Sequence, residues 1–310
     1  MAPTIDSSRI IEGWPQKQLE THLRFAVQPI ASRLDGETAL LFKAFNDLGE
    51  RGWLAPKTPQ HFGGLGISAQ AYQQLQGLIA TYSGALAFLQ TQHQSAASLL
   101  LSGENQELKQ TYLADMVTGR RKVGVGFSQL RRHPAPLKAQ KVTAGYRISG
   151  VVPWVTGAGL FTEFVGAAVL PDGRAVFGLL PLESQGGHGR GLSLGEPMAL
   201  AGMAATSTVQ VRVNDWLLNN ERVIAVKPAD WLEGRDRANP LSPIGLIFGC
   251  TQAAINELQA NLARRKIDHP ASQQLPLKLA WLRMDAPRVM ALPEEAYEQK
   301  MALRGRAIAL

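Results

Sequence analysis

The stretch Gly145-Tyr146-Arg147-Ile148-Ser149-Gly150, which continues as VVPWVTGAG to residue 159, organises the predicted fold. Apolar and polar residues alternate between its glycines, and this period of two is typical of a short, half-buried strand. Pro153 has no backbone N–H to donate to a neighbouring strand, so we expect a strand end or a bulge at that point. The stretch therefore predicts a β-strand with an irregular end.

Trp154 and Thr156 lie at this irregular end, two residues apart, and therefore share one face of the strand. A planar indole next to a hydroxyl suits a flat redox ring, because the indole gives an apolar surface and the hydroxyl can bond to a ring heteroatom. The same pair is also common in the core of an ordinary strand. The pattern alone leaves both interpretations open.

The composition indicates an ordered protein with a sizeable core, because 45% of its 310 residues are hydrophobic and only 18% are charged. An excess of 32 Lys and Arg over 25 Asp and Glu gives a net charge of +7. The basic residues are scattered, with short clusters at 120–122, 131–133 and 264–266, and no aromatic residues interleave them. We therefore expect no nucleic-acid partner, and the charge suits phosphate groups on a small molecule.

The sequence predicts a cytoplasmic protein. Its single cysteine, Cys250, excludes an internal disulfide and weakly favours a reducing compartment. Acidic residues at Asp6 and Glu12, with no apolar segment, argue against a secretory signal, and no apolar run is long enough to span a membrane. His93 lies among polar and small residues, which favours a buried side chain over a ligand, and we expect no metal site.

Periodicity predicts an α+β fold with three domains: an N-terminal helical domain (1–122), a middle β domain (123–225) and a C-terminal helical domain (226–310). Ser68 is expected to cap a helix after the glycine-dense loop 61–68, which favours a tight turn over a phosphate cradle. Alternating runs at 123–128, 164–170, 175–180 and 208–213 predict an antiparallel barrel or sandwich.

The last domain is expected to be an incomplete helical bundle. A long apolar-faced helix covers 246–265, and Pro276 and Pro287 are expected to interrupt or delimit the helices that follow. The helical pattern of 294–310 reaches the last residue with no Gly, Asn or Pro to close it. We therefore expect a shortened C-terminal domain.

Several motifs in this order resemble the acyl-CoA dehydrogenase family of flavoproteins. Residues 52–59 with Phe62-Gly63-Gly64-Leu65-Gly66 are similar to its N-terminal loop signature, and 103–113 to its "G-x-E-x-x-K-x-x-Y-L" helix. Trp154-Val155-Thr156-Gly157 resembles its Trp-Ile-Thr-Asn flavin motif, and 200–223 the loop and strand that close its middle domain. The resemblance covers about residues 40–265.

The resemblance implies FAD, held between the β domain and the C-terminal helices. By this resemblance, the backbone of Phe127 and the hydroxyl of Ser128 bond to the edge of the isoalloxazine ring. Trp154 packs against the ring, and Thr156 donates a hydrogen bond near N5. Arg265, usually of a neighbouring subunit, pairs with the pyrophosphate, and Asp236 and Arg237 contact the CoA portion of the substrate. Each also has a structural explanation, as core aromatic, strand hydroxyl or helix-end charge. The family further implies fatty acid metabolism, an acyl-CoA substrate, an electron-transfer acceptor and a homo-oligomer.

The catalytic base is the part of the family pattern that this sequence does not show. The family's reaction removes an α-proton with a carboxylate while a β-hydride passes to flavin N5. One family position for this carboxylate lies beyond Leu310, and the other falls at Ala238, with Asn239 where the family usually has Arg. Residues 128–134 also differ from the family's Thr-Glu-Pro-Gly-rich loop.

Three functions therefore stay open. The first is an acyl-CoA dehydrogenase-like oxidoreductase that carries out α,β-dehydrogenation of a thioester. The second is a flavin-dependent monooxygenase on the same scaffold, which needs reduced flavin and oxygen rather than a carboxylate base. The third is a non-catalytic relative that binds flavin or acyl-CoA.

Overall fold

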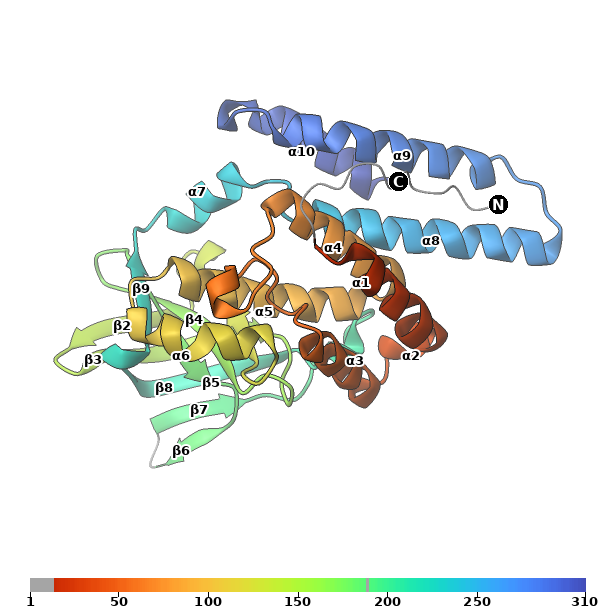
Figure 1. Cartoon of the computed structure of the whole chain (residues 1–310). Coiled ribbons are helices and arrows are strands. Elements are labelled where there is room, and N and C mark those ends of the chain that lie inside the picture. Colours follow the sequence, from red (N-terminus) through yellow and green to blue (C-terminus); the bar gives the residue numbers. More distant parts are fainter. Residues whose placement is uncertain (1–13, 188–189) are drawn as a thin grey trace.

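The computed structural model describes residues 14–187 and 190–310, and Figure 1 shows the arrangement of the elements. The segment that contains Asp6 and Glu12 lies outside the described residues. Among the helices described, none combines the length and apolar character that crossing a bilayer requires. The chain passes from helices through a sheet and back to helices, so the predicted α+β class is confirmed.

The first part of the chain is helical, as predicted. Its α-helices are α1 (Gln16–His22), α2 (Ala31–Leu34), α3 (Thr38–Glu50), α4 (Ala69–Tyr82), α5 (Gly84–Ser102) and α6 (Gln106–Val117). Ser68 caps α4, because its hydroxyl accepts a hydrogen bond from the N–H of Ala71 at 3.2 Å. The predicted cap is confirmed.

The glycine-dense loop before α4 is a tight turn that folds back on Thr58. The N–H of Gly66 donates to the carbonyl of Thr58 at 2.9 Å. A Cβ atom at Gly64 would lie 2.0 Å from the same carbonyl oxygen, so a side chain at this position would clash. Gly63 and Gly66 have positive φ angles. The glycines therefore allow a close backbone approach within the chain.

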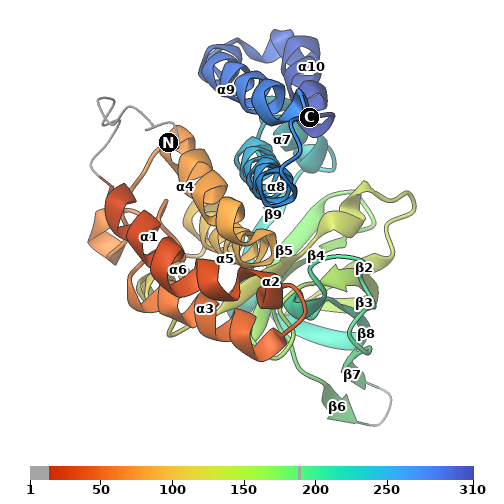
Figure 2. The same cartoon turned by 90° about the vertical axis from the view of Figure 1, so that its right-hand side faces the viewer.

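One sheet forms the middle of the molecule. Its strands are β1 (Val123–Gly126), β2 (Leu137–Val142), β3 (Gly145–Val155), β4 (Glu163–Val169), β5 (Ala175–Pro181), β6 (Gln185–Gly187), β7 (Arg190–Leu194), β8 (Val209–Asn219) and β9 (Val223–Lys227). They are arranged in the order β6-β7-β8-β3-β2-β4-β5-β9, and β1 pairs with β4. Figure 2 shows the sheet beside the helical layer.

The predicted antiparallel sheet also contains two parallel pairings, since β1 and β2 both run parallel to β4. Side chains alternate with a period of two in parallel and antiparallel strands alike. The alternating sequence pattern therefore identifies strands without fixing their direction, which depends on the connections between them. The irregular end of β3 is confirmed, because its register with β8 shifts between Val152 and Val155, around Pro153.

Four α-helices follow the sheet: α7 (Trp231–Ala238), α8 (Ile244–Arg265), α9 (Ala271–Met290) and α10 (Tyr297–Ile308). The first half of α8 packs closely along α4. A Cβ atom at Gly245 would lie 2.3 Å from the carbonyl oxygen of Gln73, and one at Gly249 would lie 2.4 Å from that of Gly77. Glycines therefore set the short distance between these two helices, and α9 lies on the far side of α8 from α4 (Figures 1 and 2).

The expectation that Pro276 and Pro287 interrupt or delimit helices was wrong, because α9 runs through both. A proline leaves the carbonyl four residues before it without its usual helical donor. For Pro276 this carbonyl belongs to Ser272, and it accepts a hydrogen bond from the side-chain amide of Gln259 on α8 at 2.8 Å. A side chain of the neighbouring helix thus replaces the missing bond.

His93 on α5 is fully buried at the junction of helices and sheet, as predicted. Nε2 lies 2.9 Å from the carbonyl of Met116, and Nδ1 lies 3.1 Å from the carbonyl and 3.2 Å from the N–H of Val123. Its ring stacks on Phe161 and meets Phe45 edge-on. Burial lowers the pKa of His93 to about 4, so the ring is neutral and structural at neutral pH.

Candidate functional site

The residues after β1 form one wall of the candidate site. The aromatic ring of Phe127 is buried, with its centroid 5.7 Å from that of Phe177, and its carbonyl accepts a hydrogen bond from the N–H of Leu130. Ser128 is half-buried and begins the short 3-10 helix η4 (Ser128–Arg131). This helix contacts β3, β4 and α7, so Ser128 begins a segment that lies where the three elements meet.

Trp154 gives the site an accessible aromatic surface. The residue is 46% exposed, although it is the next-to-last residue of a strand whose neighbours Pro153 and Val155 are buried. The guanidinium carbon of Arg132 lies 4.6 Å from the centre of its ring. A cation over an indole is attracted by the electrons of the ring, and at an exposed site this is worth about 0.5–1 kcal/mol.

Thr156 lies directly after β3 and is buried, with 6% of its surface exposed. Its hydroxyl is 3.0 Å from the hydroxyl of Thr208, which is 3.3 Å from that of Thr206. The hydroxyl of Thr206 donates to the carbonyl of Met203 at 2.7 Å. Thr156 is therefore the outer end of a chain of threonine hydroxyls.

The turn at the inner end of this chain is held by Asp35. The N–H of Met203 donates to the Asp35 carboxylate at 2.7 Å, and the N–H of Ala205 donates to the Asp35 carbonyl at 2.8 Å. Met203 and Ser207 both have positive φ angles, which non-glycine residues rarely adopt. A residue of the N-terminal helical region therefore stabilises a strained turn behind the site.

Gln129 is a buried polar residue of the site that sequence reasoning missed. Its amide nitrogen donates to the carbonyls of Gly126 at 3.2 Å and Ala167 at 2.9 Å. Its side-chain oxygen is buried without a hydrogen-bond partner among the residues that the structure describes. A glutamine beside charged loop residues gives no sequence signal of burial, so this acceptor emerges only from the three-dimensional arrangement.

Helix α7 closes one side of the site through arginines. The guanidinium carbon of Arg235 lies 5.6 Å from the ring centre of Phe127 and 5.5 Å from that of Trp231, and desolvation lowers the pKa of Arg235. Asp236 accepts two hydrogen bonds from Arg131 of η4, at 2.8 and 2.9 Å. These contacts fasten α7 to the end of β1.

The structure places the two residues expected to contact CoA on α7, each in an ion pair. Asp236 pairs with Arg131 and Arg237 pairs with Glu233 one turn earlier. Both pairs are exposed to solvent, and exposed pairs contribute little stability. A phosphate or another charged group can therefore exchange with them at low cost.

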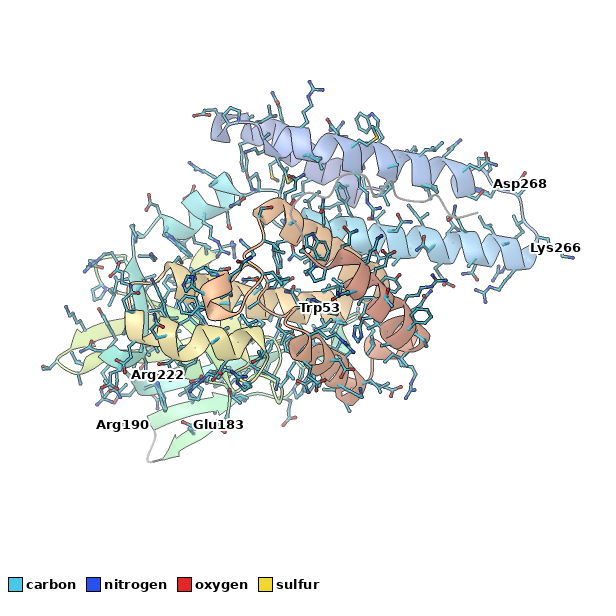
Figure 3. All side chains as sticks on the ribbon, in the orientation of Figure 1. Trp53, Glu183, Arg190, Arg222, Lys266 and Asp268 are labelled. Carbon is cyan, nitrogen blue, oxygen red and sulfur yellow. The ribbon has the colours of Figure 1, made fainter. Side chains whose placement is uncertain are left out.

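Arg265 is not brought near the other predicted site residues within one chain. It is the last residue of α8, and Figure 3 shows its neighbour Lys266 at the end of that helix opposite to α7 and the sheet. The remaining predicted residues lie on η4, α7 and the adjoining strand ends; they are Phe127, Ser128, Trp154, Thr156, Asp236 and Arg237. An ion pair between Arg265 and a ligand at this site requires a second copy of the chain.

The residues at this site suit the ring portion of FAD. The open indole of Trp154 offers a flat apolar surface, and Ser128, on the adjacent η4, offers a half-buried hydroxyl. The hydroxyl of Thr156, directly after the strand of Trp154, adds a hydrogen-bonding group. Arg132, already stacked on Trp154, adds positive charge that suits a phosphate-bearing ligand.

Comparison with known proteins identifies the first helical region. Residues 16–120 match the family model "Acyl-CoA dehydrogenase, N-terminal domain". No curated protein matches the chain. The fold is similar to solved structures that include butyryl-CoA dehydrogenase from Megasphaera elsdenii, with a TM-score of 0.70 and 15% identity over 88% of this chain and 75% of that one.

Two further similar structures are of proteins whose names do not describe an acyl-CoA dehydrogenase. One is PigA with FAD and proline, with a TM-score of 0.73 and 17% identity over 99% of this chain and 86% of that one. The other is FkbI, from the biosynthesis of a methoxymalonyl extender unit, with a TM-score of 0.72 and 16% identity over 94% of this chain and 83% of that one. The resemblance seen in the sequence is thus confirmed: residues 16–120 match the N-terminal domain of the acyl-CoA dehydrogenase family, and the overall fold is similar to that of butyryl-CoA dehydrogenase.

Proposed function

We propose that this protein is an FAD-dependent oxidoreductase that carries out α,β-dehydrogenation of an acyl-CoA thioester. The observation that carries the proposal is the open indole of Trp154, with the guanidinium of Arg132 over its ring, at a strand end of an acyl-CoA dehydrogenase fold. FAD, when bound, supplies the acceptor for a hydride at N5. The matching N-terminal domain and a similar structure that contains FAD support this assignment.

The chain's own residues have separate tasks in this proposal. Trp154 packs against the flat ring and excludes water from one side of it. Ser128 and the backbone at Phe127 hold the ring edge, and Thr156 bonds near N5. Asp236 and Arg237 exchange their surface ion pairs for contacts with the CoA portion of the substrate. Arg265 of a second copy neutralises the pyrophosphate.

A second candidate reaction is favoured because neither carboxylate of α7 suits the role of catalytic base. Asp236 is held by two hydrogen bonds from Arg131, and Glu233 pairs with Arg237. An efficient base needs a desolvated carboxylate that is free to take up a proton, and both of these carboxylates are exposed and paired with arginine. Ala238, at the end of α7, carries no carboxylate. A flavin-dependent monooxygenase needs no such base and is our alternative, followed by a non-catalytic flavin- or acyl-CoA-binding protein.

We also propose that the protein assembles as a homo-oligomer through the outer face of α9. Leu277, Trp281 and Met284 recur at helical spacing on this face, and they are 70%, 55% and 80% exposed. Exposed apolar patches of this kind are typical of interaction surfaces. A second copy that covers this face would also supply the Arg265 that one chain cannot bring to its own site.

The reaction is tested by adding acyl-CoA thioesters of different chain lengths to the FAD-loaded protein without oxygen. Bleaching of the flavin absorption band by a thioester would support dehydrogenation. No bleaching, together with oxygen consumption when a reduced-flavin donor is present, would contradict it and favour the monooxygenase. An intact flavin band with neither response would indicate the non-catalytic function.

A further inference from the structure

We infer that Thr206 and Thr208 are positioning residues, which orient the hydroxyl of Thr156 so that it accepts a hydrogen bond from the flavin rather than donating one. This inference rests on the proposed function and corrects the direction of the Thr156 hydrogen bond that the family resemblance implies. It follows from counting hydroxyl hydrogens in the chain Thr156, Thr208, Thr206.

The three hydroxyls and one carbonyl of this chain make three contacts. They are 3.0 Å between Thr156 and Thr208, 3.3 Å between Thr208 and Thr206, and 2.7 Å between Thr206 and the Met203 carbonyl. A threonine hydroxyl has one hydrogen to donate and two lone pairs. A carbonyl oxygen can only accept, so the hydrogen of Thr206 is used by Met203.

This fixed end determines the direction of the whole chain. Because Thr206 has no hydrogen left, Thr208 must donate to it. Because Thr208 then has no hydrogen left, Thr156 must donate to Thr208. One arrangement therefore makes all three bonds, and in it the hydroxyl of Thr156 keeps only lone pairs for a ligand.

Burial prevents water from altering this arrangement. Thr206 is fully buried, and Thr208, like Thr156, is only 6% exposed. The Met203 carbonyl is also fixed, since Asp35 binds the N–H groups of Met203 and Ala205 in the same turn. A buried hydroxyl without a hydrogen-bond partner is unfavourable, so the fully bonded arrangement is preferred.

An acceptor near N5 distinguishes the two redox forms of the ring. Oxidised flavin carries a lone pair at N5, whereas reduction adds two electrons to the ring and a hydrogen at N5. The lone pairs of Thr156 therefore attract the reduced form and repel the oxidised form. Hydrogen bonds to ring nitrogens are one way in which a protein tunes a cofactor, and this one raises the reduction potential of the bound FAD.

The test compares the reduction potential of bound FAD in the unaltered protein, in Thr208→Val and in Thr208→Ser. Valine removes the acceptor of Thr156 and releases its hydrogen, which then bonds to oxidised N5. We expect about a tenfold fall in the preference for reduced over oxidised FAD, which corresponds to about 30 mV for a two-electron couple. Serine keeps the hydroxyl, so Thr208→Ser should leave the potential unchanged.

Two further variants control for the loss of a hydroxyl and for misfolding. Thr81→Val removes a hydroxyl that donates to the Gly77 carbonyl within α4, and it should not change the potential. Thr206→Val frees the hydrogen of Thr208 for Thr156, so it should lower the potential as Thr208→Val does, and it replaces that variant if Thr208→Val does not fold.

The outcomes separate this inference from the proposed function. An unchanged or raised potential in the valine variants, in a protein that binds FAD, would overturn the inference alone. An equal fall in Thr208→Ser or Thr81→Val would also overturn it. A protein that binds no FAD would overturn the proposed function, and the inference with it.

Discussion

Two exposed tryptophans of this molecule each have an arginine over the ring, but their surroundings differ. Trp154 is 46% exposed, with the guanidinium carbon of Arg132 at 4.6 Å from its ring centre. Trp281 is 55% exposed, with that of Arg306 at 5.1 Å. The ring and its cation are therefore nearly equivalent at the two places.

The neighbours of each ring determine what it can bind. Trp154 lies at an irregular strand end, close in sequence to the buried hydroxyl of Thr156 and near η4, which begins with Ser128. Trp281 lies on a regular helix between the exposed apolar side chains of Leu277 and Met284. The first setting suits a flat polar ligand, and the second suits an apolar protein surface. An arginine-capped indole is thus not a site by itself.

The largest expected effect is on assembly, from Met284→Glu on the apolar face of α9. A charge buried in an apolar interface costs on the order of 4 kcal/mol, or roughly a thousandfold in association. We expect light scattering to show a fall in molecular mass and FAD affinity to weaken with it. Lys278→Glu changes the charge of α9 at an exposed position off this face and is the control. An unchanged mass in Met284→Glu would contradict an interface there.

The second-largest expected effect is on stability at acid pH and comes from His93. Its ring is fully buried, and both ring nitrogens lie within hydrogen-bonding distance of backbone groups. Its pKa is about 4 in the folded protein and about 6.5 when unfolded. Between these values the unfolded chain binds a proton that the folded one does not, so stability falls as pH drops from 6.5 to 4. The loss is about 3 kcal/mol, with no contribution from His93 above pH 6.5.

Urea unfolding at several pH values measures this effect. His93→Gln keeps one donor and one acceptor but does not titrate, so its stability should lack this part of the acid dependence. The exposed residue His61 serves for the matched substitution His61→Gln, which should retain it. The same acid dependence in His93→Gln as in the unaltered protein would show that another group is responsible.

The smallest expected effect is on FAD affinity, and it tests the comparison of the two tryptophans directly. Trp154→Ala removes the proposed packing surface, and we expect about a tenfold loss of FAD affinity, or about 1.4 kcal/mol. Because the indole is half exposed and its contact with Arg132 is weak, stability should fall by no more than about 1 kcal/mol. The mass of the assembly should not change. Equal FAD affinity in Trp154→Ala, measured by titration, would remove Trp154 from the site.

Sequence reasoning found the fold where local chemistry determined it. The Ser68 cap, the buried His93 and the irregularity at Pro153 all follow from the properties of single residues. The local sequence pattern does not reveal contacts with residues far along the chain. The strand directions around β4 depend on such contacts, and so does the continuity of α9 through Pro276, where Gln259 is the partner. The domain boundaries at residues 122 and 225 stay a prediction.

The candidate site was predictable in composition and less so in geometry. Trp154 and Thr156 were identified from their spacing and Ser128 from the family resemblance, and their roles stay predictions. The threonine chain behind Thr156 and the buried oxygen of Gln129 depend on segments about 50 and 40 residues away in the sequence. The ion pair between Arg131 and Asp236 joins segments 105 residues apart, so no local pattern could indicate it.

The most direct test of the central claim is a titration of the purified protein with FAD, followed by the flavin absorption spectrum and by quenching of tryptophan fluorescence. The proposed site predicts stoichiometric binding, with quenching that is reduced in Trp154→Ala. No FAD binding by the unaltered protein would contradict the claim and would leave Trp154 and Thr156 as structural residues of the sheet.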